Sequence, residues 1–174
     1  YVEEVVVKHG PAAAPPTSCA ACAEPLAKVG EYLYCRNRRC RALVEGRIQN
    51  WVGELDVLEV GDKLIAQLVE AKLVVEPADL YRLTAEQIAG LERRGLLIGQ
   101  KVLDNLKAAL PLPLPKFLAA LGIENFGLQT AKAIVGAGFD TLEKVQAASL
   151  EELAAVPGVG PAKAKAVVEG LKER

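Results

Sequence analysis

The sequence has few of the side chains from which active sites are built. Its 174 residues include no methionine, one histidine (His9) and two serines. No Ser/His/Asp, Cys/His or histidine-rich metal constellation can therefore be assembled. The Lys-x-Asp-Gly motif, which supplies the nucleophile in nucleotidyl transfer, does not occur either. We expect no catalytic centre in this chain, and the absence of an initial methionine predicts a piece of a longer protein.

An excess of positive charge and long apolar runs are also missing. Lys and Arg number 21 against 22 for Asp and Glu, which gives a formal net charge of -1 at pH 7. A polyanionic partner would therefore have to be bound by local clusters and backbone amides. No apolar run approaches the roughly 20 residues that span a bilayer, and the start of the chain lacks the pattern of a signal peptide. We expect a cytoplasmic protein with no membrane partner.

The cysteines, by contrast, have a spacing typical of a metal site. They form two close pairs in the pattern C-x2-C-x12-C-x4-C, at positions Cys19, Cys22, Cys35 and Cys40. Two such pairs can close one tetrahedron of thiolates around a structural Zn²⁺, which would order a segment with little core of its own. Two disulfides are the alternative, but the spacing and the missing export signal favour zinc. The prediction is a zinc finger over residues 19–47, with an apolar shell of Leu26, Val29, Leu33 and Leu43.

Arginines bracket the second cysteine pair and form the densest positive cluster in the chain: Arg36, Arg38, Arg39 and Arg41. Guanidinium groups match phosphate oxygens in geometry and charge. We therefore predict that Arg36, Arg38 and Arg39 contact the phosphates of a nucleic acid. A solvated face of the zinc module is the alternative.

Two short segments precede the cysteines. Residues 1–9 place valines among glutamates and a lysine in a strand pattern. A lone strand is not stable, so this segment is expected to be the tail of a β domain. The prolines of residues 10–18 indicate a semi-rigid linker.

The stretch Val156-Pro-Gly-Val-Gly160, followed by a proline and a run of helix formers, predicts a tight hairpin that enters a helix. Gly158 and Gly160 permit positive φ values, and Pro161 suits a first helical turn. We expect the amides of Val159, Gly160, Ala162 and Lys163 to point outward. Together with the helix dipole and the Lys163 ammonium, these amides would form an anion site suited to a backbone phosphate. An ordinary corner between two helices is the alternative.

This hairpin is one of four. Glycines at Gly61, Gly95, Gly127 and Gly160 are separated by 34, 32 and 33 residues. The residue four positions before each glycine is aliphatic, and the residue four positions after it is small in three of the four cases. Such a period is a repeat signature. It predicts a mainly α fold over residues 48–174, built from four helix-hairpin-helix repeats.

The repeats are expected to form two double units, over about 53–110 and 116–172. Capping boxes, Thr84-x-x-Gln87 and Ser149-x-x-Glu152, precede the second and fourth hairpins only. The segment Pro111–Pro115 between the units cannot continue a helix and predicts a short, stiff connector.

The four hairpins are not expected to bind phosphate equally. Glu59 would repel a phosphate at the first hairpin, whereas Arg94 would supply charge at the second. The third and fourth hairpins have glycines and helix-borne donors and are predicted to hold DNA phosphates. Their predicted contact residues are Gly127, Thr130 and Lys132, and Gly158, Val159, Gly160, Lys163 and Lys165.

Taken together, these features resemble the C-terminal half of bacterial NAD-dependent DNA ligases. The matching residues are Cys19-Ala-Ala-Cys22, Cys35-Arg-Asn-Arg-Arg-Cys40-Arg-Ala42, Asp79-Leu-Tyr-Arg-Leu-Thr84, Leu91-Glu92, Phe117-Leu-Ala-Ala-Leu-Gly-Ile123 and Val156-Pro-Gly-Val-Gly160. The resemblance covers the whole chain. The chain departs from the family pattern at Glu59, where a hairpin glycine is usual, and at Arg41, where a proline is usual.

The resemblance implies that residues 1–9 are the last strand of an OB-fold and that the NAD-using adenylation domain lies upstream. It also implies a monomer whose helical domain grips nicked double-stranded DNA without reading sequence, in nick sealing during replication and repair. We expect this bacterial, cytoplasmic protein to associate with the nucleoid during repair. The rival interpretation is a zinc and helix-hairpin-helix adaptor of recombination or excision repair. A scaffold with no nucleic-acid role is a third.

Overall fold

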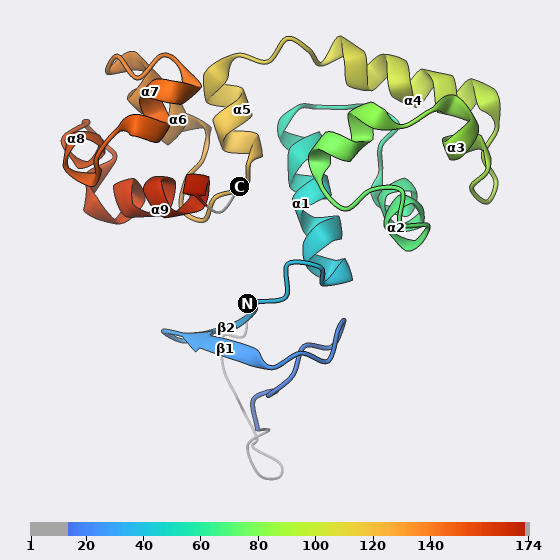
Figure 1. Cartoon of the computed structure of the whole chain (residues 1–174), viewed down its shortest axis with the longest axis horizontal. Coiled ribbons are helices and arrows are strands. Elements are labelled where there is room, and N and C mark those ends of the chain that lie inside the picture. Colours follow the sequence, from blue (N-terminus) through green and yellow to red (C-terminus); the bar gives the residue numbers. More distant parts are fainter. Residues whose placement is uncertain (1–13, 173–174) are drawn as a thin grey trace, which may run out of the picture. The chain divides into compact units, whose positions relative to one another are not determined.

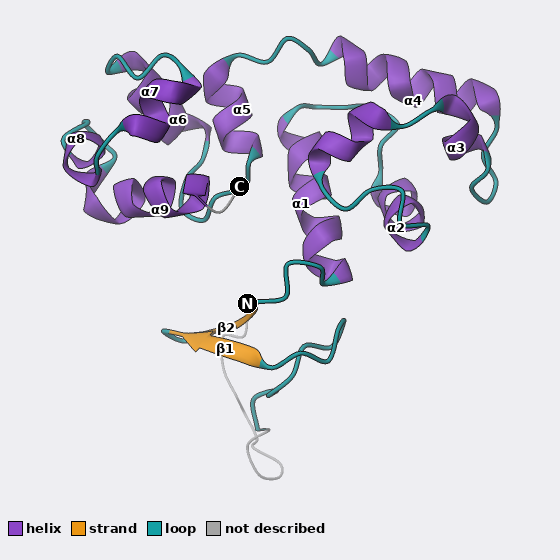
Figure 2. Cartoon of the chain, in the orientation of Figure 1, coloured by secondary structure: helices purple, strands orange, loops and turns teal. Residues whose placement is uncertain are grey.

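The computed structural model describes residues 14–172, which divide into two compact units at Cys40 (Figure 1). The strand predicted for residues 1–9 lies outside the described residues, as does most of the linker predicted for 10–18. The mainly α fold class is confirmed, and the only sheet among residues 14–172 has two strands (Figure 2).

The first unit is built on an antiparallel hairpin of β1 (Leu26–Val29) and β2 (Tyr32–Cys35). Leu26 pairs with Cys35 and Val29 with Tyr32, and Gly30 turns the chain with a φ of 59°. The expected apolar shell around the cysteines is wrong for most of its members. Val29 and Leu33 are exposed, because no second layer of described residues covers the short hairpin, and Leu43 is exposed on the first helix.

The second unit is helical throughout its described part. Its elements in order are α1 (Arg41–Glu54), α2 (Asp62–Glu70), the 3-10 helix η1 (Pro77–Arg82), α3 (Ala85–Ala89), α4 (Leu96–Ala108), α5 (Leu114–Ala120), α6 (Leu128–Gly136), α7 (Leu142–Ala147), α8 (Leu150–Ala154) and α9 (Gly160–Lys172). The first helix begins at Arg41, earlier than the Ile48 expected from the pattern. The connector is also shorter than predicted, since α5 begins at Leu114 and takes Pro115 into its first turn.

The four repeats share part of their hairpin backbone conformation but differ at the hairpin glycine, whose φ is positive (67°) only at Gly160. Gly61, Gly95 and Gly127 are the N-caps of α2, α4 and α6, and Gly160 opens α9. The residue two positions before each glycine is left-handed, with φ values of 69°, 59°, 59° and 83° at Glu59, Arg93, Asn125 and Gly158. The predicted repeat register is therefore correct, and only the fourth hairpin has glycine at its left-handed position.

The second helix of each repeat packs through the position predicted to allow close approach. The residues four positions after the hairpin glycines are all buried: Ile65, Gly99, Ala131 and Ala164. At Gly99 the approach is extreme, because a Cβ atom there would lie 2.5 Å from the carbonyl oxygen of Ala85 in α3. Small residues at this position therefore allow the paired helices to touch.

Both predicted capping boxes are present. The hydroxyls of Thr84 and Ser149 accept from the amides of Gln87 and Glu152, whose side chains accept from the cap amides in return. The structure adds a third box at the start of η1. There the Asp79 carboxylate accepts from two amides, 3.0 and 3.1 Å away, and from the Arg82 guanidinium at 2.8 Å.

Two apolar clusters form the core of the helical unit, one around α1, α2 and α4 and the other around α6, α8 and α9. Phe117 of α5 packs against both clusters. Its ring meets Trp51 edge-on with centroids 5.9 Å apart, and the Trp51 indole N–H donates to the Tyr81 hydroxyl at 3.1 Å. The side-chain amide of Asn50 donates to the Ala120 carbonyl at 3.0 Å. Contacts between α1 and α5 thus join the two double repeats.

Candidate metal centre and nucleic-acid interface

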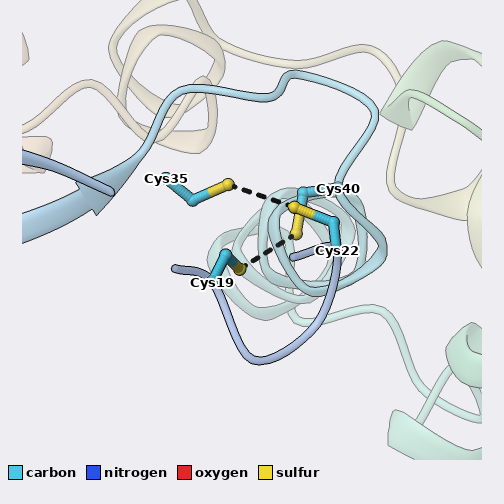
Figure 3. Close-up of side chains that lie close together, drawn as sticks. All are labelled: Cys19, Cys22, Cys35 and Cys40. Carbon is cyan, nitrogen blue, oxygen red and sulfur yellow. Dashed lines mark hydrogen bonds between the residues drawn. The ribbon is translucent and has the colours of Figure 1, made fainter. Parts of the chain in front are cut away.

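The four cysteine sulfurs converge in the first unit (Figure 3). Cys19 and Cys22 lie on the loop before β1, Cys35 ends β2, and Cys40 closes the loop that follows. The Sγ atoms of Cys19 and Cys40 are 3.8 Å apart, those of Cys22 and Cys35 are 3.6 Å apart, and all four lie within 4.8 Å of one another. Sulfurs bound to one tetrahedral zinc at ~2.3 Å would be ~3.8 Å apart. The cluster therefore has the dimensions of a four-thiolate metal site.

Backbone hydrogen bonds shape the two loops that hold the sulfurs. The Ala23 amide donates to the Cys19 carbonyl at 2.8 Å, and the Cys40 amide donates to the Asn37 carbonyl at 2.9 Å. The sulfurs are much farther apart than the ~2.05 Å of a disulfide, so the geometry favours a shared metal ion over two disulfides. The sequence alone left both alternatives open.

The thiols are held in unequal electrostatic surroundings. Donation from the backbone amides of Ala21 and Cys22 lowers the pKa of Cys19 to about 7. The Asn37 amide lowers the pKa of Cys35, but burial and the neighbouring sulfurs outweigh it and raise this pKa to about 12. Zn²⁺ binds cysteine as the thiolate, so an ion bound here would displace the thiol protons and offset the mutual repulsion of the four sulfurs.

The predicted arginine cluster lies on the second cysteine loop. Arg36, Arg38 and Arg39 are exposed there, and the Arg39 amide is fixed by the Asn37 side-chain oxygen at 3.0 Å. Arg41 differs, because its Nε donates to Glu45 at 2.7 Å and its guanidinium is 3.6 Å from Glu70. A phosphate contact by Arg36, Arg38 and Arg39 stays a prediction.

In the fourth hairpin, the expectation of an outward Val159 amide is wrong. This amide donates to the Val156 carbonyl at 3.1 Å and closes the turn, while the Val159 side chain is buried in the core. Gly160 opens α9, whose first turn has no intrahelical acceptors for its leading amides. The Lys163 ammonium donates to the Gly158 carbonyl at 2.9 Å, so it lies over the hairpin.

The third hairpin brings Gly127 and Lys132 to the surface but not Thr130. Only 8 % of Thr130 is exposed, which corrects the prediction that its hydroxyl faces a ligand. The equivalent position, three residues after the hairpin glycine, is buried at Leu64 of the first repeat but exposed at Ile98 of the second, so burial there differs from repeat to repeat. Lys132 and Lys165 both follow their hairpin glycines by five positions and are both exposed.

The first hairpin is braced by α4. Lys101 of α4 forms an ion pair with Glu59 at 2.6 Å, and Asn105 donates to the Leu58 carbonyl at 3.0 Å. The hydrogen bond and charge of Lys101 lower the pKa of Glu59. Sequence reasoning found Glu59 but not its partners, which lie more than 40 positions away.

The second hairpin is braced by α2. Gln67 accepts from Arg94 Nε at 3.3 Å and donates to the Glu92 carbonyl at 3.1 Å. Arg94, which was predicted to contact phosphate, is partly buried and already engaged by this hydrogen bond. The exposed cation of this hairpin is Arg93 instead.

Within residues 14–172, no helix has both the length and the apolar character needed to cross a membrane.

Comparison with known families first defines the class of the helical unit. Residues 117–173 match the model described as a SAM-like Helix-hairpin-helix tandem. The whole chain is similar to part of a protein named DNA ligase from Sorangium cellulosum strain So ce56, with 57% identity over 174 residues. Of the chain, 91% aligns at 39% identity with DNA ligase 2 of Deinococcus deserti, and 90% aligns at 37% identity with a DNA ligase of Treponema pallidum.

The chain spans 26%, 24% and 19% of the lengths of these three relatives. It is therefore a homologue of a segment of the DNA ligases, and the resemblance predicted from its sequence is confirmed.

Proposed function

We propose that this chain is the non-catalytic, sequence-independent DNA-binding segment of an NAD-dependent DNA ligase that seals nicks during replication and repair. The observation that carries the proposal is the shared hairpin geometry, in which a glycine opens the second helix of each repeat. Alignment of the whole chain to part of a protein named DNA ligase supports this assignment over an adaptor of recombination or excision repair. The use of NAD, a cytoplasmic location and action as a monomer at the nucleoid belong to the same proposal.

Hairpins 3 and 4 are proposed to hold the phosphates of nicked double-stranded DNA. Gly127 and Gly160 place the leading amides of α6 and α9 next to exposed lysines at equivalent positions, Lys132 and Lys165. Helix N-termini and ammonium groups together favour a phosphate oxyanion. Because none of these groups reads a base edge, such binding would not depend on sequence.

The cysteine cluster is proposed to hold a structural Zn²⁺. Four sulfurs leave no coordination position open for water or substrate, so the ion would order the first unit and perform no chemistry. Its proposed role is to fix the loop that carries Arg36, Arg38 and Arg39.

The test measures fluorescence anisotropy of a labelled nicked duplex over a range of salt concentrations. Neutralisation of about four to six phosphates predicts that log K falls with log salt with a slope of about -4 to -5. Charge reversal of Lys132 and Lys165 together is expected to reduce this slope by about two. Lys107→Glu, at the far end of α4 from its hairpin, is the matched control. Binding that ignores salt, or that strongly prefers one sequence, would contradict the proposal.

A further inference from the structure

Three consecutive apolar residues open α4 directly after the second hairpin and are left uncovered by the described residues. Leu96, Leu97 and Ile98, here named the apolar ridge, are 58%, 89% and 39% exposed. None of them belongs to either core cluster. Single exposed leucines are common on proteins, whereas three consecutive exposed apolar residues raise the question of what covers them.

The ridge occupies the first three positions after the hairpin glycine, where the second helix of each repeat begins. In hairpin 4 the equivalent residues are Pro161, Ala162 and Lys163, where Lys163 lies over the hairpin. Successive helical residues lie 100° apart around the axis. The three apolar side chains therefore surround the start of α4 and do not form one lateral stripe.

Positive charge lies immediately beside the ridge. The Arg93 side chain is almost fully exposed, and its ion pair among the described residues is a 3.4 Å contact with its neighbour Glu92. Arg93 also holds the left-handed position of the hairpin, so it projects from the turn just before the ridge. An apolar surface with a cation at its edge is complementary to a ligand that alternates apolar and anionic groups.

We propose that the apolar ridge packs against deoxyribose rings of duplex DNA while Arg93 contacts the adjacent phosphate. This inference rests on the proposed function and assigns the second hairpin a contact that is mainly apolar. A nucleic-acid strand presents deoxyribose C–H surface between successive phosphates, which matches the order of ridge and arginine. Apolar contact with a duplex has precedent in proteins that insert leucine or isoleucine between base steps in the minor groove, although the contact proposed here is with the sugars.

A second copy of the chain is a poorer occupant. Three side chains fall well short of the ~800 Å² that each partner buries in a stable interface. A twofold contact centred on the ridge would also bring Arg93 of each copy close to Arg93 of the other. DNA has no such conflict, because it supplies the opposite charge.

The experiment compares the full chain with its Leu96→Ser, Leu97→Ser double variant in nicked-duplex binding at several salt concentrations. Apolar burial does not release counterions, so the dissociation constant is expected to rise about tenfold at every salt concentration with an unchanged slope. Arg93→Gln should instead reduce the slope by about one. Val75→Ser, which removes an exposed apolar side chain far from any hairpin glycine in sequence, is the matched control. Far-UV circular dichroism checks that each variant is folded.

An unchanged dissociation constant in the ridge variant would overturn the inference. If charge reversal of Lys132 and Lys165 still weakened binding in that case, the proposed DNA-binding function would stand without the ridge contact. Failure of the unmodified chain to bind duplex would overturn both the proposed function and the ridge contact. Loss of self-association in sedimentation, with DNA binding intact, would assign the ridge to contact between copies and refute the inference.

Discussion

Gly99→Ala is predicted to destabilise the helical unit, although alanine is the better helix former. Gly99 lies inside α4, where its backbone meets α3. A Cβ atom would lie 2.5 Å from the Ala85 oxygen, 3.1 Å from its Cα and 3.2 Å from its carbonyl carbon. All three are backbone atoms, so no side-chain rotation can relieve the overlap.

Two opposing terms set the size of the effect. The helix propensity of alanine favours the variant by ~1 kcal/mol. A carbon–oxygen contact is normally no shorter than ~3.3 Å, so α3 and α4 must separate by ~0.8 Å. Forcing extra volume into a packed interface typically costs ~1–3 kcal/mol, and a backbone obstacle places this site in the upper part of that range. The net loss is expected to be ~1–2 kcal/mol, equivalent to a fall in Tm of roughly 3–6 °C for a chain of this size.

The assay is thermal and urea denaturation followed by circular dichroism at 222 nm. Gly46→Ala is the control, because Gly46 lies inside α1 and an added Cβ would meet nothing within 4 Å. That variant should gain up to ~1 kcal/mol from helix propensity alone. The two substitutions are therefore expected to change stability in opposite directions. Equal stabilisation by both would refute the close approach of α3 and α4.

Three further outcomes are expected. Asp79 keeps a lowered pKa despite partial burial, because its hydrogen-bond donors outweigh desolvation; its stabilisation is complete above the unfolded pKa of ~3.9 and is lost as pH falls. Asp79→Asn should therefore cost ~1–2 kcal/mol in urea denaturation at pH 7 and progressively less below pH ~4. Chelation, or Cys40→Ser, should abolish binding of one zinc per chain, measured by metal analysis, and leave most of the helical signal unchanged. Trp51→Phe should cost ~1 kcal/mol in thermal denaturation, because the Tyr81 hydroxyl loses its indole donor.

The repeat was predictable because its signals are local and recur. A glycine with an aliphatic residue four positions earlier recurs in all four repeats, and a small residue four positions later recurs in three, so the register could be read without knowing any tertiary contact. The cysteine cluster was predictable for a similar reason, since its four residues form two pairs that are each close in sequence. The capping boxes at Thr84 and Ser149 depend only on residues three positions apart.

Other features depend on contacts that the sequence does not encode locally. The strands β1 and β2 have four residues each, too few for an alternation pattern to be visible. The ion pair between Glu59 and Lys101 joins two different repeats, and neither residue indicates its partner. Burial of Thr130 depends on which face of α6 meets the core. The repeat offered no consistent signal, because the same position is buried at Leu64 but exposed at Ile98.

The left-handed position of each hairpin shows how one scaffold has diverged. Holding a non-glycine residue there costs ~1 kcal/mol or more, and asparagine tolerates it best. Despite this cost, hairpins 1 and 2 have long charged side chains at the left-handed position, Glu59 and Arg93. Glu59 is tied back to α4 and blocks its own hairpin to anions, whereas Arg93 extends beside the apolar ridge. Gly158 leaves hairpin 4 with no side chain at this position. The residue at this single position thus distinguishes three hairpins. Glu59 makes hairpin 1 a structural brace, Arg93 gives hairpin 2 a mixed apolar and cationic surface, and Gly158 leaves hairpin 4 a turn suited to a phosphate.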